Sequence, residues 1–288
     1  MKFAFIEEHR AWWRLGRMCR LLGVSKAGYF AWRDRAPCER DDDDRALSVR
    51  IQAIHAESRK TYGSPRIHRE LRAQGMAIGR KRVERLMRQA GIRVKPQTRF
   101  VVTTDSDHDL PVADNLLEQD FTASAPNQRW VTDITYVPTQ EGWLYVAAII
   151  DLFSRMVVGW AMQERMDRSL VLSALSMAIG QRQPAAGLLH HSDRGSQYAS
   201  EDYRRKLAEH DIVASMSRRA CCYDNAAMES FWHTLKGELI HRRTFQTRAE
   251  AKQAIFEYIQ VFYNRLRRHS SIGYVSPVEF ERQHSAVA

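Results

Sequence analysis

Three acidic residues are set apart by their surroundings: Asp133, Asp193 and Glu229. Asp133 lies inside the β-rich run WVTDITYV, Asp193 comes shortly after the apolar run GLLHH, and Glu229 lies in the helical pattern DNAAMESFWHTLK. Aspartate is disfavoured inside strands, so Asp133 needs a compensating partner. Taken singly, the three have ordinary explanations: a strand ion pair, a turn and a solvated helix face. Taken together, they form a candidate catalytic set.

Carboxylates that converge on one point repel each other and raise each other's pKa unless a cation joins them. Oxygen ligands without a cluster of Cys and His favour Mg²⁺, with Mn²⁺ as a substitute. Two such ions, about 3.5–4 Å apart, activate the attacking oxygen and stabilise the leaving oxygen when a phosphodiester is displaced. We therefore expect Asp133, Asp193 and Glu229 to hold two divalent ions.

Other polar residues lie close to this set in the sequence. Lys236 follows Glu229 by seven positions, nearly two helical turns, so the two point the same way. They form either a surface ion pair or a metal ligand beside a phosphate contact. His190 and His191 precede Asp193 and either support the site or pack in a strand. Asn225 either contacts DNA or caps the helix.

The order of the predicted elements indicates what must position these residues. Three β-rich runs, WVTDITYV, WLYVAAIID and RMVVGWAM, are followed by a helix over about 168–182, and then by alternating short strands and helices. This order is typical of a ribonuclease-H-like α/β domain, which we expect over 125–240. A C-terminal helical extension over 241–288 contains a helix of about 248–264, opened by the capping box at Thr247 and Glu250.

The charge is distributed unevenly along the 288 residues. The formal net charge is +10, which indicates a polyanionic partner, with DNA as the first candidate. Residues 1–100 carry 24 Lys and Arg against 11 Asp and Glu, whereas residues 101–214 carry 9 against 16. We expect the basic part to bind phosphates and the acidic part to hold cations, although solvated surface is an ordinary alternative for either.

The basic first third is predicted to be helical. Residues 1–40 indicate a helix-turn-helix-like segment, in which Gly23 ends one helix and Ser25 caps the next. Residues 45–100 indicate a basic helix-turn-helix domain, and 101–124 a linker rich in turn-forming residues. The last helix of that domain carries five candidate DNA contacts: Arg80, Lys81, Arg82, Arg85 and Arg88. The alternative is a small helical bundle with an exposed basic face.

Other classes of protein fit the sequence poorly. The start, MKFAFIEEHR, meets charge too early for a secretory signal, and the longest apolar run, 143–150, is far below the roughly 20 residues that span a bilayer. The four cysteines form no C-x-x-C pair, which disfavours a disulfide scaffold or a zinc site. We therefore expect no membrane association and a reducing, cytoplasmic location.

The spacing of the three acids is also specific. Between Asp133 and Asp193 lie 59 residues, and between Asp193 and Glu229 lie 35. This resembles the D-D-35-E signature of transposases with a retroviral-integrase-like core. The words HSDRGSQY, DNAAMESFWHTLKGE and YNRLRRHSSIGYVSPVEF, together with CRLLGVSKAGYFAWR and HAESRKTYGSPRIHREL, resemble the second-frame product (OrfB) of the third family of bacterial insertion sequences. The resemblance covers about residues 18–281.

The resemblance implies a ribonuclease-H-like integrase core that cleaves and joins DNA strands with divalent metal. It also implies that Lys236 lies near the transferred DNA end, that the chain assembles as a homo-oligomer on DNA, and that an upstream OrfA-type protein or frameshift fusion takes part. The location would be the bacterial cytoplasm, at the nucleoid. Two alternatives are a hydrolytic nuclease of the same fold and a DNA-binding regulator without catalysis; the intact acidic triad argues against the regulator.

Overall fold

The computed structural model describes residues 1–35, 39–94, 111–219 and 222–285. The α-helices are α1 (Lys2–His9), α2 (Leu15–Leu21), α3 (Lys26–Arg33), α4 (Glu39–Glu57), α5 (Ser64–Ala73), α6 (Arg80–Gln89), α7 (Arg168–Arg182), α8 (Ser196–Ala199), α9 (Glu201–Ala208), α10 (Ala226–Glu238), α11 (Arg248–Glu257) and α12 (Pro277–Ser285). The strands are β1 (Arg129–Thr139), β2 (Gly142–Asp151), β3 (Val157–Gln163), β4 (Leu189–Ser192) and β5 (Val213–Met216). The expected linker lies partly outside the described residues, and its described part, 111–124, contains no helix or strand.

A five-stranded mixed sheet forms the centre of the larger part of the chain, with the strand order β3-β2-β1-β4-β5. β1, β2 and β3 form an antiparallel meander, and β4 and β5 run parallel to β1 and to each other. The predicted α/β class is confirmed. β1 lies in the middle of the sheet, so a residue on it can face helices on either side.

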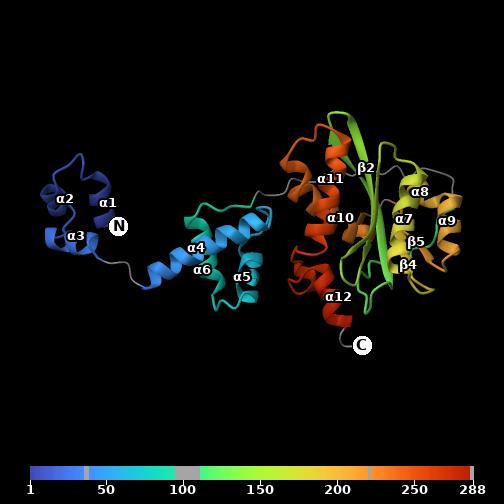
Figure 1. Cartoon of the computed structure of the whole chain (residues 1–288), viewed down its shortest axis with the longest axis horizontal. Helices are drawn as coiled ribbons and strands as arrows, with labels where there is room; N and C mark the ends of the chain where they lie inside the picture. Colours follow the sequence, from blue (N-terminus) through green and yellow to red (C-terminus); the bar gives the residue numbers. More distant parts are fainter. Residues whose placement is uncertain (36–38, 95–110, 220–221, 286–288) are drawn as a thin grey trace.

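Helices cover both faces of this sheet (Figure 1). Because side chains alternate along a strand, Val131 of β1 packs into the hydrophobic cluster that contains α10 and α11, whereas Trp130 packs into the cluster that contains α7 and α9. The predicted helix over 248–264 is α-helical only to Glu257 and continues as a π-helix, Tyr258–Tyr263. The wider turn changes which side chains face the sheet at this point.

The first three helices form a small unit with its own core of Ile6, Met18, Cys19 and Tyr29. Gly23 has a φ of +62° after α2, and the Ser25 hydroxyl accepts a hydrogen bond from the Gly28 amide, as the sequence indicates. Helix α1 was not predicted from the sequence.

The helices α4, α5 and α6 form a second helical unit, and Figure 1 shows them between α1–α3 and the sheet. Ile51, Ile67 and Val83, one from each helix, are fully buried and belong to the same hydrophobic cluster as Val131 and α10. This unit is therefore packed against the sheet domain. Within the described residues, none of the helices combines the length and apolar character needed to cross a bilayer.

Candidate active site

Two of the three acids, Asp133 and Asp193, belong to neighbouring parallel strands or to the residue directly after one. Val131 of β1 lies opposite His191 of the parallel strand β4. Asp133 lies two residues further along β1, and Asp193 is the first residue after β4, which ends at Ser192. The charge of Asp193 acts on Asp133, so the two carboxylates are neighbours. Asp133 shares its side of β1 with Val131, which faces α10.

The third acid, Glu229, lies in the first turn of α10, and this helix is held against β1. The Asn225 side-chain amide donates a 3.0 Å hydrogen bond to the carbonyl of Thr132, the residue before Asp133. Asn225 thus fixes the beginning of α10 to β1 and makes no side-chain cap on the helix. Burial raises the pKa of Glu229.

Asp133 receives two hydrogen bonds inside the protein. Its Oδ1 accepts from the Ile134 amide at 2.8 Å, and its Oδ2 accepts from the indole nitrogen of Trp232 at 3.0 Å. Burial, the charge of Asp193 and, more weakly, the charge of Glu229 raise the pKa of Asp133 to about 8, against the lowering effect of the two donors. The three acids are thus electrostatically linked, with Asp133 at their centre.

Several carboxylate oxygens of the acidic set accept hydrogen bonds from protein donors and are not directed at one common point. Asp193 Oδ1 accepts from the Gly195 amide at 2.9 Å, so one oxygen of Asp193 and both of Asp133 are directed at protein donors. In the described residues, no group of three or more His, Cys, Asp or Glu side chains is arranged to hold a metal ion as it stands. The donor set is nevertheless of the kind that Mg²⁺ prefers, three carboxylates whose mutual repulsion a cation would relieve.

Lys236 is more buried than a DNA contact on an exposed helix face would be, with 8% of its surface exposed. Its ammonium group lies 5.0 Å from the centre of the Tyr136 ring, on β1. Burial lowers the pKa of Lys236, whereas the charge of Asp133 raises it. Lys236 therefore lies within electrostatic reach of the acidic set, on the same helix as Glu229.

The two histidines before Asp193 are neutral core residues. His190 Nε2 lies 2.6 Å from the Tyr203 hydroxyl, and burial lowers the pKa of His190 to about 3. His191 bonds to the hydroxyls of Ser215 and Ser217, and burial lowers its pKa to about 4. They pack β4 against its neighbours, which is the second of the two explanations given by the sequence.

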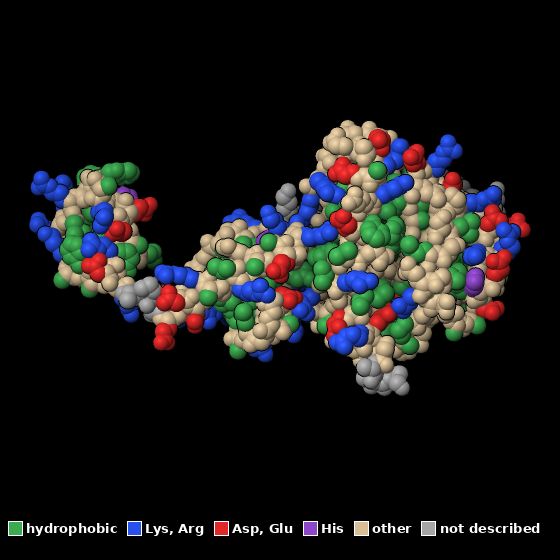
Figure 2. All heavy atoms as spheres, in the orientation of Figure 1, with side chains coloured by type: hydrophobic (Ala, Val, Ile, Leu, Met, Phe, Trp, Pro, Cys, Tyr) green, Lys and Arg blue, Asp and Glu red, His purple; other side chains and the backbone are tan. Residues whose placement is uncertain are grey.

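The five basic residues expected to contact DNA all lie on α6 and differ in their pairing. Arg82 and Arg85 both bind Asp44 of α4, at 2.7 and 2.6 Å. Arg80 pairs with Glu84 at 3.0 Å. For Lys81 and Arg88, the described residues provide no ion pair. Figure 2 shows further Lys and Arg side chains over the surface of the α4–α6 unit.

Trp232 was not identified from the sequence, and Asn225 was named there as a DNA contact or a helix cap, whereas in the structure it binds β1. Asn225 donates a hydrogen bond to the Thr132 carbonyl, and Trp232 donates one to the Asp133 carboxylate. A signal for Trp232 is its position three residues after Glu229, which places it on the next turn of the same helix. Its partner, 99 positions earlier in the chain, becomes known only from the fold.

Comparison with known protein families defines the class. Residues 123–222 and 229–284 match two models that are each described as an integrase core domain, and residues 41–100 match an HTH-like domain. The chain is 45% identical to "Transposase InsF for insertion sequence IS3A" of Escherichia coli (strain K12), over 99% of this chain and 100% of that protein. It is 48% identical to the "Insertion element IS600 uncharacterized 31 kDa protein" of Shigella sonnei, over 94% and 100%.

The chain belongs to the IS3 family of insertion-sequence transposases. Its function is thus DNA transposition, and its class of activity is that of polynucleotidyl transferases; neither the nuclease nor the regulator is favoured. Among solved structures, the HTLV-2 integrase catalytic core domain in complex with magnesium is similar, with 16% identity, a TM-score of 0.41 and coverage of 56% of this chain and 98% of that one.

Proposed function

We propose that Asp133, Asp193 and Glu229 hold two divalent ions and that the chain cleaves and joins DNA strands at this site. The observation that supports the proposal is the position of Asp133 on β1, whose parallel neighbour β4 ends directly before Asp193, together with the hydrogen bond from Trp232 of the Glu229 helix to Asp133. Bound Mg²⁺ would activate the attacking oxygen and stabilise the leaving oxygen of a phosphodiester, and Mn²⁺ would substitute.

The residues of the chain have distinct tasks in this proposal. The three carboxylates bind the ions and set their separation. Trp232 and Asn225 hold β1 and α10 together, so that the acid on the strand and the acid on the helix keep their relative positions. Lys236 moves from the Tyr136 ring to the DNA end and holds the freed strand for the joining step.

The partners follow from the same reaction. Element ends and target duplex are its DNA substrates, and joining two ends to one target calls for a homo-oligomer. We include an upstream OrfA-type protein, or its frameshift fusion, as the partner in recognition of the ends. We propose that the chain is divided into the units 1–40, 45–100, 125–240 and 241–288. We also propose that the protein acts at the bacterial nucleoid.

The test uses the DNA that flanks the gene as substrate, with precut ends, Mg²⁺, a target plasmid and the upstream partner protein. Labelled ends should become covalently joined to the plasmid, and EDTA should abolish both cleavage and joining. Cleavage without any joined product from active, partner-supplemented protein would favour a hydrolytic nuclease instead.

A further inference from the structure

An open cavity of about 350 Å³ lies beside α10, and none of the three acids is among its lining residues. Its walls come from α10, from the segment before α12, from α5 of the helix-turn-helix-like unit, from the end of β2 and the turn after it that carries Arg155, and from Phe121 and Tyr263. A neighbouring hollow of about 500 Å³ shares part of this lining. The polar groups common to both hollows are Arg66, Ser230, Thr234 and Arg267.

The walls carry more positive than negative charge. Arg66, Arg155 and Arg267 line the first cavity, and Arg242 lines the second. Glu238 is the carboxylate among the lining residues, and it is bound by both arms of Arg267 at 2.8 Å. One carboxylate therefore faces several guanidinium groups.

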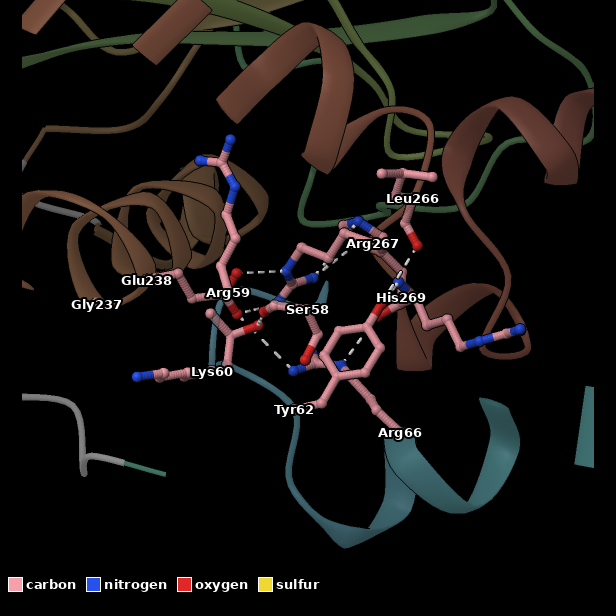
Figure 3. A network of polar contacts seen from close by, with 12 residues as sticks. Ser58, Arg59, Lys60, Tyr62, Arg66, Gly237, Glu238, Leu266, Arg267 and His269 are labelled. Carbon is pink, nitrogen blue, oxygen red and sulfur yellow. Dashed lines mark hydrogen bonds and ion pairs between the residues drawn. The ribbon is translucent and has the colours of Figure 1, made fainter. Parts of the chain in front are cut away.

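Figure 3 shows how Arg66 reaches this carboxylate from the helix-turn-helix-like unit. Its Nη1 lies 3.9 Å from Glu238 Oε1, which is already satisfied by Arg267. Its Nε donates to the carbonyl of Arg268 at 2.9 Å. Arg66 therefore shares the Glu238 carboxylate with Arg267. Burial and the charge of Arg267 lower the pKa of Arg66, whereas the charge of Glu238 raises it.

Arg155 is a second cation of the cavity wall. Its Nη2 donates to the Phe121 carbonyl at 3.1 Å, and no carboxylate of the described ranges forms an ion pair with it. Burial lowers the pKa of Arg155. His269, also in the wall, has a pKa well below its usual range because of burial and the charge of Arg267, so it adds no charge of its own.

The cavity also lies next to the catalytic face of α10. Ser230 follows Glu229 directly, and successive residues of a helix are about 100° apart around its axis. Ser230 and Thr234, four residues apart, thus form a stripe of hydroxyl donors beside the stripe of Glu229 and Lys236. The cavity and the acidic set therefore lie on adjoining faces of α10.

We propose that this cavity binds a backbone phosphate of DNA, held by Arg66 and Arg155 with hydroxyls of α10, and so connects the helix-turn-helix-like unit to the strand being processed. Guanidinium groups bind phosphate oxygens through pairs of N–H donors, which suits a pocket lined by two of them. The proposal rests on the proposed function, because it takes the ligand to be the DNA on which the acids act.

The experiment measures the salt dependence of DNA binding by the full chain in EDTA, so that its outcome is independent of cleavage. The R66Q/R155Q variant should bind a duplex from the flanking DNA more weakly. Its log–log salt slope should be shallower by roughly 0.9 for each phosphate contact that is lost. The R66K/R155K variant, which keeps both charges, should retain the wild-type slope.

Arg205→Gln is the matched control, since Arg205 lies on α9, on the other side of the sheet, and forms only exposed ion pairs. If R66Q/R155Q lowers the melting temperature, R155Q alone provides the test, because the Arg155 side chain donates its hydrogen bond to the Phe121 carbonyl, outside α5. Wild-type slopes in R66Q/R155Q and R155Q would overturn the proposal.

A titration with inorganic phosphate separates DNA from a free anion. Phosphate that binds wild type but not R66Q/R155Q, combined with an unchanged DNA slope, would assign the cavity to a free phosphate and contradict the DNA proposal. A shallower slope in R66Q/R155Q, combined with a wild-type chain that binds DNA but does not cleave it in Mg²⁺, would support the phosphate site and count against the proposed chemistry alone.

Discussion

The indole nitrogen of Trp232 donates a 3.0 Å hydrogen bond to Oδ2 of Asp133. Trp232 lies three residues after Glu229, so α10 supplies one acid and orients another. The indole is 1% exposed, which keeps water from replacing it as the donor. The direction of the Asp133 carboxylate thus depends on the packing of a helix that lies far away in the sequence.

Replacing Trp232 by Phe should reduce cleavage while the chain remains folded. Phenylalanine keeps most of the apolar contacts but lacks the N–H donor. A hydrogen bond to a charged group contributes about 1.5–3 kcal/mol, so we expect a loss of roughly 10- to 100-fold in rate. Single-turnover cleavage in Mg²⁺ measures this loss, and calorimetric titration with Mn²⁺ should show weaker binding.

Trp130→Phe is the matched control. Trp130 is also fully buried and directs its indole nitrogen at a carboxylate, Asp151, at 3.4 Å. Asp151 lies outside the acidic set. Equal losses in the two variants would mean that Trp232 acts through general packing.

Substituting any of the three acids by its amide, D133N, D193N or E229Q, should abolish cleavage. DNA affinity should stay within a few fold of wild type, because phosphate contacts dominate the affinity. Cleavage gels and fluorescence anisotropy on the same samples measure the two properties. A variant that keeps substantial cleavage in Mg²⁺ would remove its residue from the proposed metal site.

Lys236→Ala should impair joining more than nicking. The three carboxylates remain able to bind the ions, whereas the freed DNA end loses its positioning contact. The ratio of joined to nicked product, measured with precut and uncut ends, reports this difference. An equal loss of both products would make Lys236 a general substrate or structural contact, which its position over the Tyr136 ring would then explain.

The basic residues of α6 should divide into two groups. Lys81→Gln and Arg88→Gln should each make the salt slope of DNA binding shallower by about 1. Arg82→Gln and Arg85→Gln should chiefly weaken the attachment of α6 to Asp44 and change the slope less. If the second pair changes the slope as much as the first, the ion pairs with Asp44 open when DNA binds.

Stability should rise with pH over the range in which His190 and His191 titrate. Both have folded-state pKa values, about 3 and about 4, below the unfolded value near 6.5. Between pH 4 and 6.5 the unfolded chain therefore binds protons that the folded chain does not, and acid favours unfolding by up to about 1.4 kcal/mol per pH unit for each histidine. Urea titrations across this range measure the slope.

His191→Gln should reduce this slope, since glutamine has a donor and an acceptor for Ser215 and Ser217 but does not titrate. An unchanged slope in that variant would assign the pH dependence to other groups.

The local features of the site were predictable from the sequence, whereas its long-range contacts were not. Asp133 in a strand, Asp193 after one and Glu229 on a helix follow from periodicity and spacing. The pairing of Arg82 with Asp44 joins residues 38 positions apart, and that of Arg66 with the Arg268 carbonyl joins residues 202 apart. Such pairs depend on how helices pack, which a single sequence does not encode as a periodic pattern. Lys236 shows the same limit, because its helical face was predictable and its burial was not.

Helix α10 connects the acidic set at one end to the contacts with the helix-turn-helix-like unit at the other end. Near its beginning is Glu229, and at its end is Glu238, which pairs with Arg267 and lies 3.9 Å from Arg66 of the helix-turn-helix-like unit. A continuous helix transmits displacement along its axis almost without loss. Under the proposed function, we expect a tilt of α5 either to break the contact at Glu238 or to shift Glu229 relative to Asp133. DNA bound by the helix-turn-helix-like unit would then influence the geometry of the proposed cleavage site through α10.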